Sequence, residues 1–213
     1  MEEREWAKLE VIFVSAALLM IAFSLMLPEF KITTHSGGGG FPRTAEQWLY
    51  FDVLKTKTTY SGSTYTDYKS YDDVGSVDYE DLADVLTNEK TLLACWALLC
   101  WMLVVVLVYG RELVQVMVGW MTVIAGLVAI VYPVVEISVP VPWMSGFFGS
   151  GTLSDGTVSW GPSSAWYIGV IATILVGAAV VRRMSRFFME PKKKDEDSDV
   201  LPAPNDSTDS LTR

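Results

Sequence analysis

The chain has 213 residues, of which 51% are hydrophobic, and its formal net charge is −9 at pH 7. Its charged residues are confined to a few islands between long apolar runs, which excludes an ordinary soluble helical domain, because each helix of such a domain carries a polar stripe. The acidic balance also argues against a nucleic-acid partner, since nucleic acids are polyanions.

Four apolar runs are long enough to cross a hydrocarbon core, which needs about 17–25 residues per helix. No Asp, Glu, Lys or Arg lies in their interiors, where such a residue is costly. The first run is interpreted as a retained helix, because the residues before it are too acidic for a signal peptide. The predicted division is an N-terminus at 1–10, a helix at 11–28, an outer loop at 29–90, a helix at 91–109, a turn at 110–112, a helix at 113–135, an outer loop at 136–163, a helix at 164–181 and a tail at 182–213.

The orientation follows from the basic residues after the fourth run, because Lys and Arg near helix ends mark the cytoplasmic side. These residues are Arg182, Arg183, Arg186, Lys192, Lys193 and Lys194. We therefore predict a multi-pass protein of the cell membrane with both termini in the cytoplasm. The basic segment is expected to lie on anionic headgroups, and the polar end of the tail to be disordered.

The first outer loop begins with a glycine tether, Gly37–Gly40, and then turns to strand-forming residues. The Thr- and Tyr-rich segment around a Ser61-Gly62-Ser63 turn predicts a hairpin at about 47–71. Acidic residues after it begin a short helix at about 79–90, which either bends or runs directly into the second membrane helix.

Aromatic side chains are dense in this loop, and tyrosine offers contact area at low entropic cost. The predicted interaction residues are Trp48, Tyr50, Tyr60, Tyr65, Tyr68, Tyr71 and Tyr79. The alternative is that they only cover the faces of a small sheet.

In the second outer loop an Asp155-Gly156 turn between alternating residues predicts a second hairpin at about 152–160. The expected fold class is therefore a mainly α membrane protein. It has a bundle of four transmembrane helices and a small extracytoplasmic β-sheet built from the two outer loops.

Small residues form strips on two of the predicted helices, and such strips let helix backbones approach closely in lipid. The third helix carries Gly119, Thr122, Gly126 and Ala129, and the fourth carries Gly169, Thr173 and Gly177. These strips pack helices within one chain or between copies.

No constellation of catalytic residues is recognisable. His35 is the single histidine, and Cys95 and Cys100 lie five residues apart in the second apolar run, on different helix faces. We therefore predict no enzyme activity, no cofactor and no metal site. The loop acids offer oxygen ligands for calcium, but they lack the spacing of an EF-hand.

Short motifs resemble the claudin and peripheral-myelin-protein superfamily of four-helix membrane proteins. Ala165-Trp166-Tyr167-Ile168-Gly169 and the later Gly177-Ala178-Ala179 are similar to the claudin fourth helix, and Trp48 is similar to the tryptophan region of its first loop. The resemblance implies four helices with both ends inside. The cysteine pair that this family carries in its first loop is absent here.

These features predict a structural or interaction protein, or an accessory subunit, that uses the Tyr- and Asp-rich outer loop for recognition. Its expected partners are the lipid bilayer and either another membrane or extracellular protein or a second copy. The alternative is an oligomeric channel or transporter component whose acidic outer loops favour cations.

Overall fold

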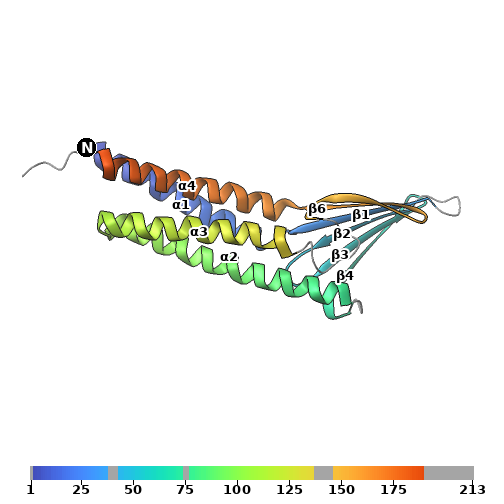
Figure 1. Ribbon diagram of the computed structural model, residues 1–213. Helices are drawn as coiled ribbons and strands as arrows, with labels where there is room; N and C mark the ends of the chain where they lie inside the picture. The colour runs from blue at the N-terminus through green and yellow to red at the C-terminus, as the bar shows by residue number, and fades with distance from the viewer. Residues whose placement is uncertain (1, 38–42, 74–76, 137–145, 190–213) are drawn as a thin grey trace, which may run out of the picture.

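The computed structural model describes residues 2–37, 43–73, 77–136 and 146–189. Four helices run alongside one another, and an antiparallel sheet projects from one end of the bundle (Figure 1). The helices are α1 (Glu2–Ser24), α2 (Val77–Tyr109), α3 (Glu112–Glu136) and α4 (Ser164–Met189). The start of α1, the α2–α3 turn and the end of α4 lie at the end opposite the sheet.

Three of these helices are long and apolar enough to cross a membrane: Leu82–Tyr109, Glu112–Glu136 and Ser164–Phe188. Their outward sides carry large exposed apolar side chains, such as Leu98, Ile124 and Ile174, which lipid rather than water would cover. The predicted membrane character of the chain is confirmed at this level.

The sheet has six strands in the order β4-β3-β2-β1-β6-β5, and every neighbouring pair is antiparallel. The strands are β1 (Phe30–Ser36), β2 (Arg43–Leu49), β3 (Leu54–Tyr60), β4 (Ser63–Lys69), β5 (Gly149–Leu153) and β6 (Gly156–Pro162). A single turn of 3₁₀ helix, η2 (Tyr71–Asp73), follows β4. The small antiparallel sheet built from two loops, predicted from turn and strand signals, is present.

The first loop contains more strands than the sequence predicted. β1 was not predicted, because the glycine run that follows it was interpreted as a tether. Residues 38–40 of that tether lie outside the described residues. The predicted hairpin at 47–71 is instead the β3–β4 pair, and β2 is a separate strand that ends at Leu49. Ser61 and Gly62 form the β3–β4 turn with φ values of 46° and 81°, which match a type I′ turn.

Helix boundaries also differ from the prediction. The first helix ends at Ser24 rather than at 28; the residue before Pro28 is biased away from helix, and proline lacks an N–H. The short helix predicted at 79–90 runs directly into the second membrane helix, which was one of the two predicted alternatives, and together they form α2. α4 extends beyond 181 to Met189, through the first basic residues.

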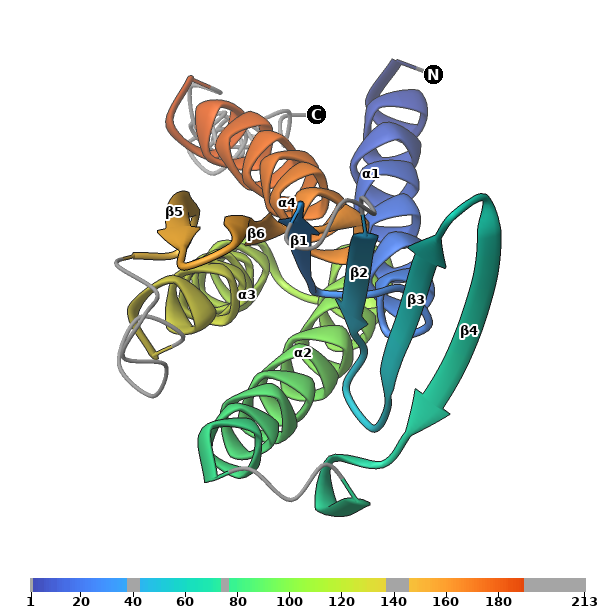
Figure 2. The same ribbon diagram turned by 90° about the vertical axis from the view of Figure 1, so that its right-hand side faces the viewer.

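The segment that follows α1 is hydrogen-bonded to the start of α4. The backbone N–H of Ser163 donates to the carbonyl of Glu29 at 2.7 Å, and that of Ala165 donates to the carbonyl of Pro28 at 3.2 Å. Since β1 follows one helix and β6 precedes the other, this junction brings the two strands side by side and joins the strands of the two loops into one sheet (Figure 2).

Candidate functional site

The sheet presents two chemically different faces. Side chains alternate along each strand, so the pairing register decides which residues share a face. One face carries the buried side chains of Phe30, Ile32, Leu49 and Leu54 at its end beside the bundle. The opposite face, which we call the polar face, carries Lys31, Thr33, His35, Thr44, Glu46, Trp48, Lys55, Lys57, Thr59, Thr64, Thr66 and Tyr68.

The row of the polar face closest to the helices alternates lysines with aromatic rings. The register places Lys31 opposite Trp48, Trp48 opposite Lys55, and Lys55 opposite Tyr68. Nζ of Lys31 and Nζ of Lys55 lie 5.1 and 5.5 Å from the Trp48 ring centroid, and Nζ of Lys55 is 5.4 Å from that of Tyr68. These distances are those of cation–π contacts; we call these four residues the lysine–aromatic row.

The next row holds the carboxylate of the polar face. Glu46 lies 2.6 Å from Nζ of Lys31 and 3.9 Å from Nζ of Lys57. Lys55 forms no salt bridge within the described residues. Among the described residues, its ammonium group contacts the rings of Trp48 and Tyr68 and no carboxylate.

The strands of the sheet carry more basic than acidic residues, whereas the first outer loop, which contains most of these strands, is acidic as a whole. Its strands carry Lys31, Arg43, Lys55, Lys57 and Lys69 against Glu46 and Asp67. Most loop acids follow the sheet in the sequence, between positions 72 and 84. Basic side chains therefore predominate on the strands, although the outer loop at 29–90 as a whole is acidic.

The predicted aromatic interaction residues separate into four groups. Trp48, Tyr50 and Tyr68 lie on the polar-face side, whereas Tyr60 and Tyr65 belong to the opposite face and are also exposed. Tyr71 is only 4% exposed and donates its hydroxyl proton to the carbonyl of Tyr50, so it holds the β2–β3 loop rather than offering contact area. The side chain of Tyr79 lies outside the described residues.

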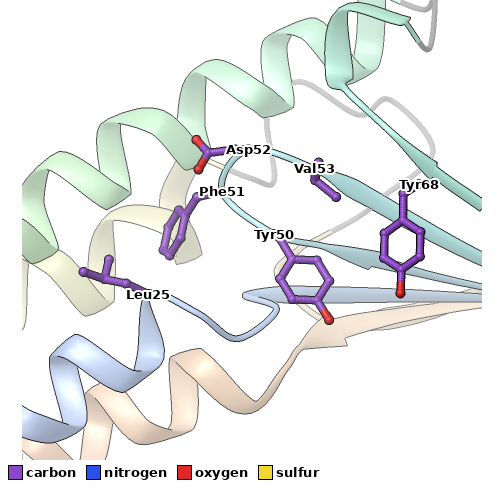
Figure 3. A pocket seen from close by; sticks show the side chains of 6 residues that line it. All are labelled: Leu25, Tyr50, Phe51, Asp52, Val53 and Tyr68. Carbon is purple, nitrogen blue, oxygen red and sulfur yellow. The ribbon is translucent and has the colours of Figure 1, made fainter.

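A pocket of about 360 Å³ opens where the end of α1 meets the β2–β3 loop and β4. Its lining residues are Leu25, Tyr50, Phe51, Asp52, Val53 and Tyr68 (Figure 3). Asp52 is turned toward α2, where its two carboxylate oxygens accept from Nζ of Lys90 at 2.8 and 2.7 Å. The Tyr50 and Tyr68 rings point the same way, with their hydroxyls at the free end.

Two carboxyl groups are buried where the sheet joins the bundle. Glu29 is 3% exposed and Glu89 is 2% exposed, and the two groups interact electrostatically. Oε2 of Glu89 accepts no hydrogen bond from the described residues. Burial raises the pKa of the Glu29 carboxyl from 4.5 to about 8, because desolvation disfavours the charged form.

Aromatic packing near Glu29 and Glu89 joins the sheet to the helices. The Phe147 ring lies 5.6 Å from Phe30 on β1 and 5.5 Å from Trp166 on α4, between ring centroids. Nε1 of Trp166 donates to the carbonyl of Ile130 on α3 at 3.1 Å. The base of the sheet therefore cannot tilt without disturbing two helices.

The predicted small-residue strip of α3 lies inside the bundle. Gly119, Thr122, Gly126 and Ala129 are all buried. A Cβ at Gly119 would lie 2.9 Å from Val180 on α4, and one at Gly126 would lie 2.7 Å from the Trp96 ring on α2.

On α4, Gly169 faces Ile130 and Thr173 is buried, but a Cβ at Gly177 would meet nothing within 4 Å. Close packing of this strip therefore ends before Gly177.

The basic residues predicted for the membrane surface also have contacts between helices. Arg183 lies 3.5 Å from the Glu112 carboxylate at the start of α3, and Arg186 lies 3.3 Å from that of Glu10 on α1. Arg182 is half-buried beside them. Lys192, Lys193 and Lys194 lie outside the described residues.

Within the described part of the chain, no group of three or more His, Cys, Asp or Glu side chains is arranged to hold a metal. His35 hydrogen-bonds to Thr44 of the neighbouring strand at 3.1 Å. Cys95 is exposed on α2, and Cys100 is buried in the same helix.

Sequence reasoning missed Lys31, Lys55, Glu29 and Glu89. The alternation of lysines with threonines at 55–58 was a detectable signal of one charged strand face. The burial of Glu29 and Glu89 left no local signal. A comparison with known protein families finds no matching family model, and no curated protein matches the chain.

Proposed function

We propose that this protein crosses the cell membrane four times and displays its sheet outside. Three helices have the required length and apolarity, and α1 runs alongside them with the remaining apolar run. The start of α1 and the end of α4 lie together at the end opposite the sheet, where Arg182, Arg183 and Arg186 gather. Their positive charge favours a cytoplasmic location for that end.

The function we propose is that of a structural or interaction protein, or an accessory subunit, whose polar face binds another protein. The observation that carries this proposal is that the strands extend away from the bundle, so that no helix covers their outer part (Figure 1). The polar face combines lysines and aromatic rings with a layer of threonines, and aromatic residues are enriched at interfaces.

The charges of this face favour an acidic partner surface. Lys31, Lys55 and Lys57 share it with a single carboxylate, that of Glu46. Complementary charge would steer such a partner and fix its orientation. Most acidic residues of this loop follow the strands in the sequence, between positions 72 and 84.

The buried hydroxyl groups of the helices favour an interaction role over a channel. The hydroxyls of Ser24, Thr122 and Thr173 each donate to a carbonyl of their own helix, at 2.8, 2.8 and 3.0 Å. Hydroxyl groups that are hydrogen-bonded in this way do not serve as ligands for a permeating ion.

The claudin-like resemblance fits the same proposal at the level of architecture. The chain order of one helix, four strands, two helices, two strands and one helix is what a four-helix protein with two sheet-forming outer loops requires. We therefore propose a claudin-like layout and transfer no residue role from that family.

A photo-crosslinking amino acid at Thr66, on the polar face, tests the proposed function in native membranes. Tyr65 is the matched control, because it is adjacent on β4 but points to the opposite face. We expect one defined protein adduct from position 66, with at least about fivefold less from position 65. High salt should weaken the adduct, because charge contacts at an exposed surface are screened.

The Lys57→Glu variant sharpens the test, because it reverses one charge of the face at an exposed site. It should reduce the adduct from position 66, and mass spectrometry should identify the captured chain as a different protein or a second copy. Equal adducts from both positions, or none from either, would contradict binding through the polar face.

A further inference from the structure

The pocket between α1 and the sheet has an amphipathic lining. Leu25, Phe51 and Val53 supply apolar surface, and Tyr50 and Tyr68 supply two phenol groups. Within the described residues, neither phenol hydroxyl has a hydrogen-bond partner in the protein. A ligand that fits this lining needs an apolar part and a hydrogen-bonding group together.

An apolar path on α1 leads to this pocket. Leu19, Phe23 and Met26 are strongly exposed, at 72%, 58% and 76%. Leu19 and Phe23 lie one turn apart on α1, and Met26 follows the end of that helix at Ser24. Met26 is adjacent to Leu25, which lines the pocket. An acyl chain lying along this path would therefore bring its headgroup to the pocket.

The charge beside the pocket is positive. Asp52 is neutralised by Lys90, which bonds both of its carboxylate oxygens. Lys55 holds its ammonium 5.4 Å from the centroid of the Tyr68 ring, and the described residues offer it no carboxylate. A lysine on a flexible stem is a suitable point-charge ligand for phosphate.

We propose that this pocket binds the headgroup of an anionic phospholipid. Lys55 and the Tyr50 and Tyr68 hydroxyls contact the phosphate, while the acyl chains follow Leu25 and the exposed side of α1. The site lies at the base of the sheet, so the bound lipid would fix the height of the sheet above the bilayer. This inference depends on the membrane location and not on the protein partner proposed above.

Native mass spectrometry of the full chain in a mild detergent tests the site with two probes, dioleoyl-phosphatidylglycerol and dioleoyl-phosphatidylcholine. We expect the phosphatidylglycerol to bind about tenfold more tightly, since a charge-assisted contact distinguishes the two lipids. The Lys55→Gln variant should lose this preference.

Lys57→Gln is the matched control, because Lys57 lies on the same strand and face but one row farther from the helices, beside Glu46. It should retain the lipid preference. Tyr68→Phe keeps the ring and removes one donor, so it should weaken binding about two- to tenfold. Tyr68→Phe therefore tests the site even if Lys55→Gln lowers the melting temperature.

Three results would overturn the proposal. The first is equal binding of the two lipids to the unmodified protein. The second is that Lys57→Gln weakens binding as much as Lys55→Gln, which would indicate nonspecific surface charge. The third is displacement of the lipid by millimolar inorganic phosphate, which would indicate a phosphate site without recognition of the acyl chains.

Discussion

At the scale of single residues, the buried carboxyl of Glu29 ties the stability of this protein to pH. Its backbone N–H donates to the carbonyl of Leu49 at 2.9 Å and its carbonyl accepts from the N–H of Ser163 at 2.7 Å, so the backbone of Glu29 is fixed at the junction. Glu89 faces the same interior, and its Oε2 is without a hydrogen bond from the described residues. Charging this site places an anion where water cannot solvate it.

The sign of the pH dependence follows from the pKa of Glu29, which burial raises to about 8. The folded protein keeps a proton that the unfolded chain releases above about pH 4.5. The free energy of unfolding should therefore fall as pH rises from about 4.5 to about 8.

Glu29→Gln removes this titration and should flatten the dependence. At pH 8 the variant should be more stable than the unmodified protein by at least about 1 kcal/mol, or about 2–4 °C in Tm. Thermal melts in detergent at pH 5, 7 and 9 measure this difference. Glu46→Gln, at the surface of the sheet, is the control; parallel slopes for Glu29→Gln and the unmodified protein would refute the expectation.

At the scale of elements, the contact between α2 and α3 depends on a glycine. A Cβ at Gly126 would lie 2.7 Å from Cε2 and Cζ2 of Trp96, and Trp96 is completely buried. Thr122, one turn away, reaches the carbonyl of Leu99 on α2 at 3.5 Å. Gln115 joins the same two helices at their turn, where Nε2 donates to the carbonyl of Gly110 at 2.9 Å.

Gly126→Ala should therefore destabilise the bundle by about 1–3 kcal/mol, because overpacking forces the helices or the indole to move. Gly177→Ala is the matched control on α4, where the added methyl group meets nothing within 4 Å. That variant should be neutral or more stable by about 0.5–1 kcal/mol, since alanine favours helix over glycine. Melting temperatures in one detergent compare the two, and equal losses would contradict the packing argument.

At the scale of the whole molecule, the bundle and sheet define two ends that should lie on opposite sides of a membrane. Ser63 lies at the β3–β4 turn and Ser185 near the end of α4, and both are exposed. Single cysteines at these positions, in a background that lacks Cys95 and Cys100, show on which side of the membrane each position lies.

A membrane-impermeant maleimide should label the Ser63→Cys variant in intact cells. It should label the Ser185→Cys variant only after the cells are permeabilised, because the basic end of α4 is expected in the cytoplasm. The reverse pattern would contradict the proposed orientation, and labelling of both in intact cells would contradict four crossings.

The sequence by itself determined the features that depend on neighbouring residues. Hydropathy identified the three membrane-length helices, because crossing a hydrocarbon core requires a continuous apolar run. Ser61-Gly62 identified the β3–β4 turn, where both residues have positive φ angles. Asp155-Gly156 identified the second hairpin, but its turn lies one residue earlier, because Gly156 already begins β6. The small residues of α3 were recognisable by their helical spacing.

Only the tertiary structure decided which distant residues meet. Pairing of β1 with β2, of β2 with β3 and of β3 with β4 set the register that aligns Lys31, Trp48, Lys55 and Tyr68 in one row. The same pairing, with the α1–α4 junction, buried Glu29 beside Glu89, two carboxyls that a sequence reading assigns to water. The physical reason is that strand register and burial depend on contacts between segments far apart in the chain, whereas hydropathy and turn preference are properties of each segment alone.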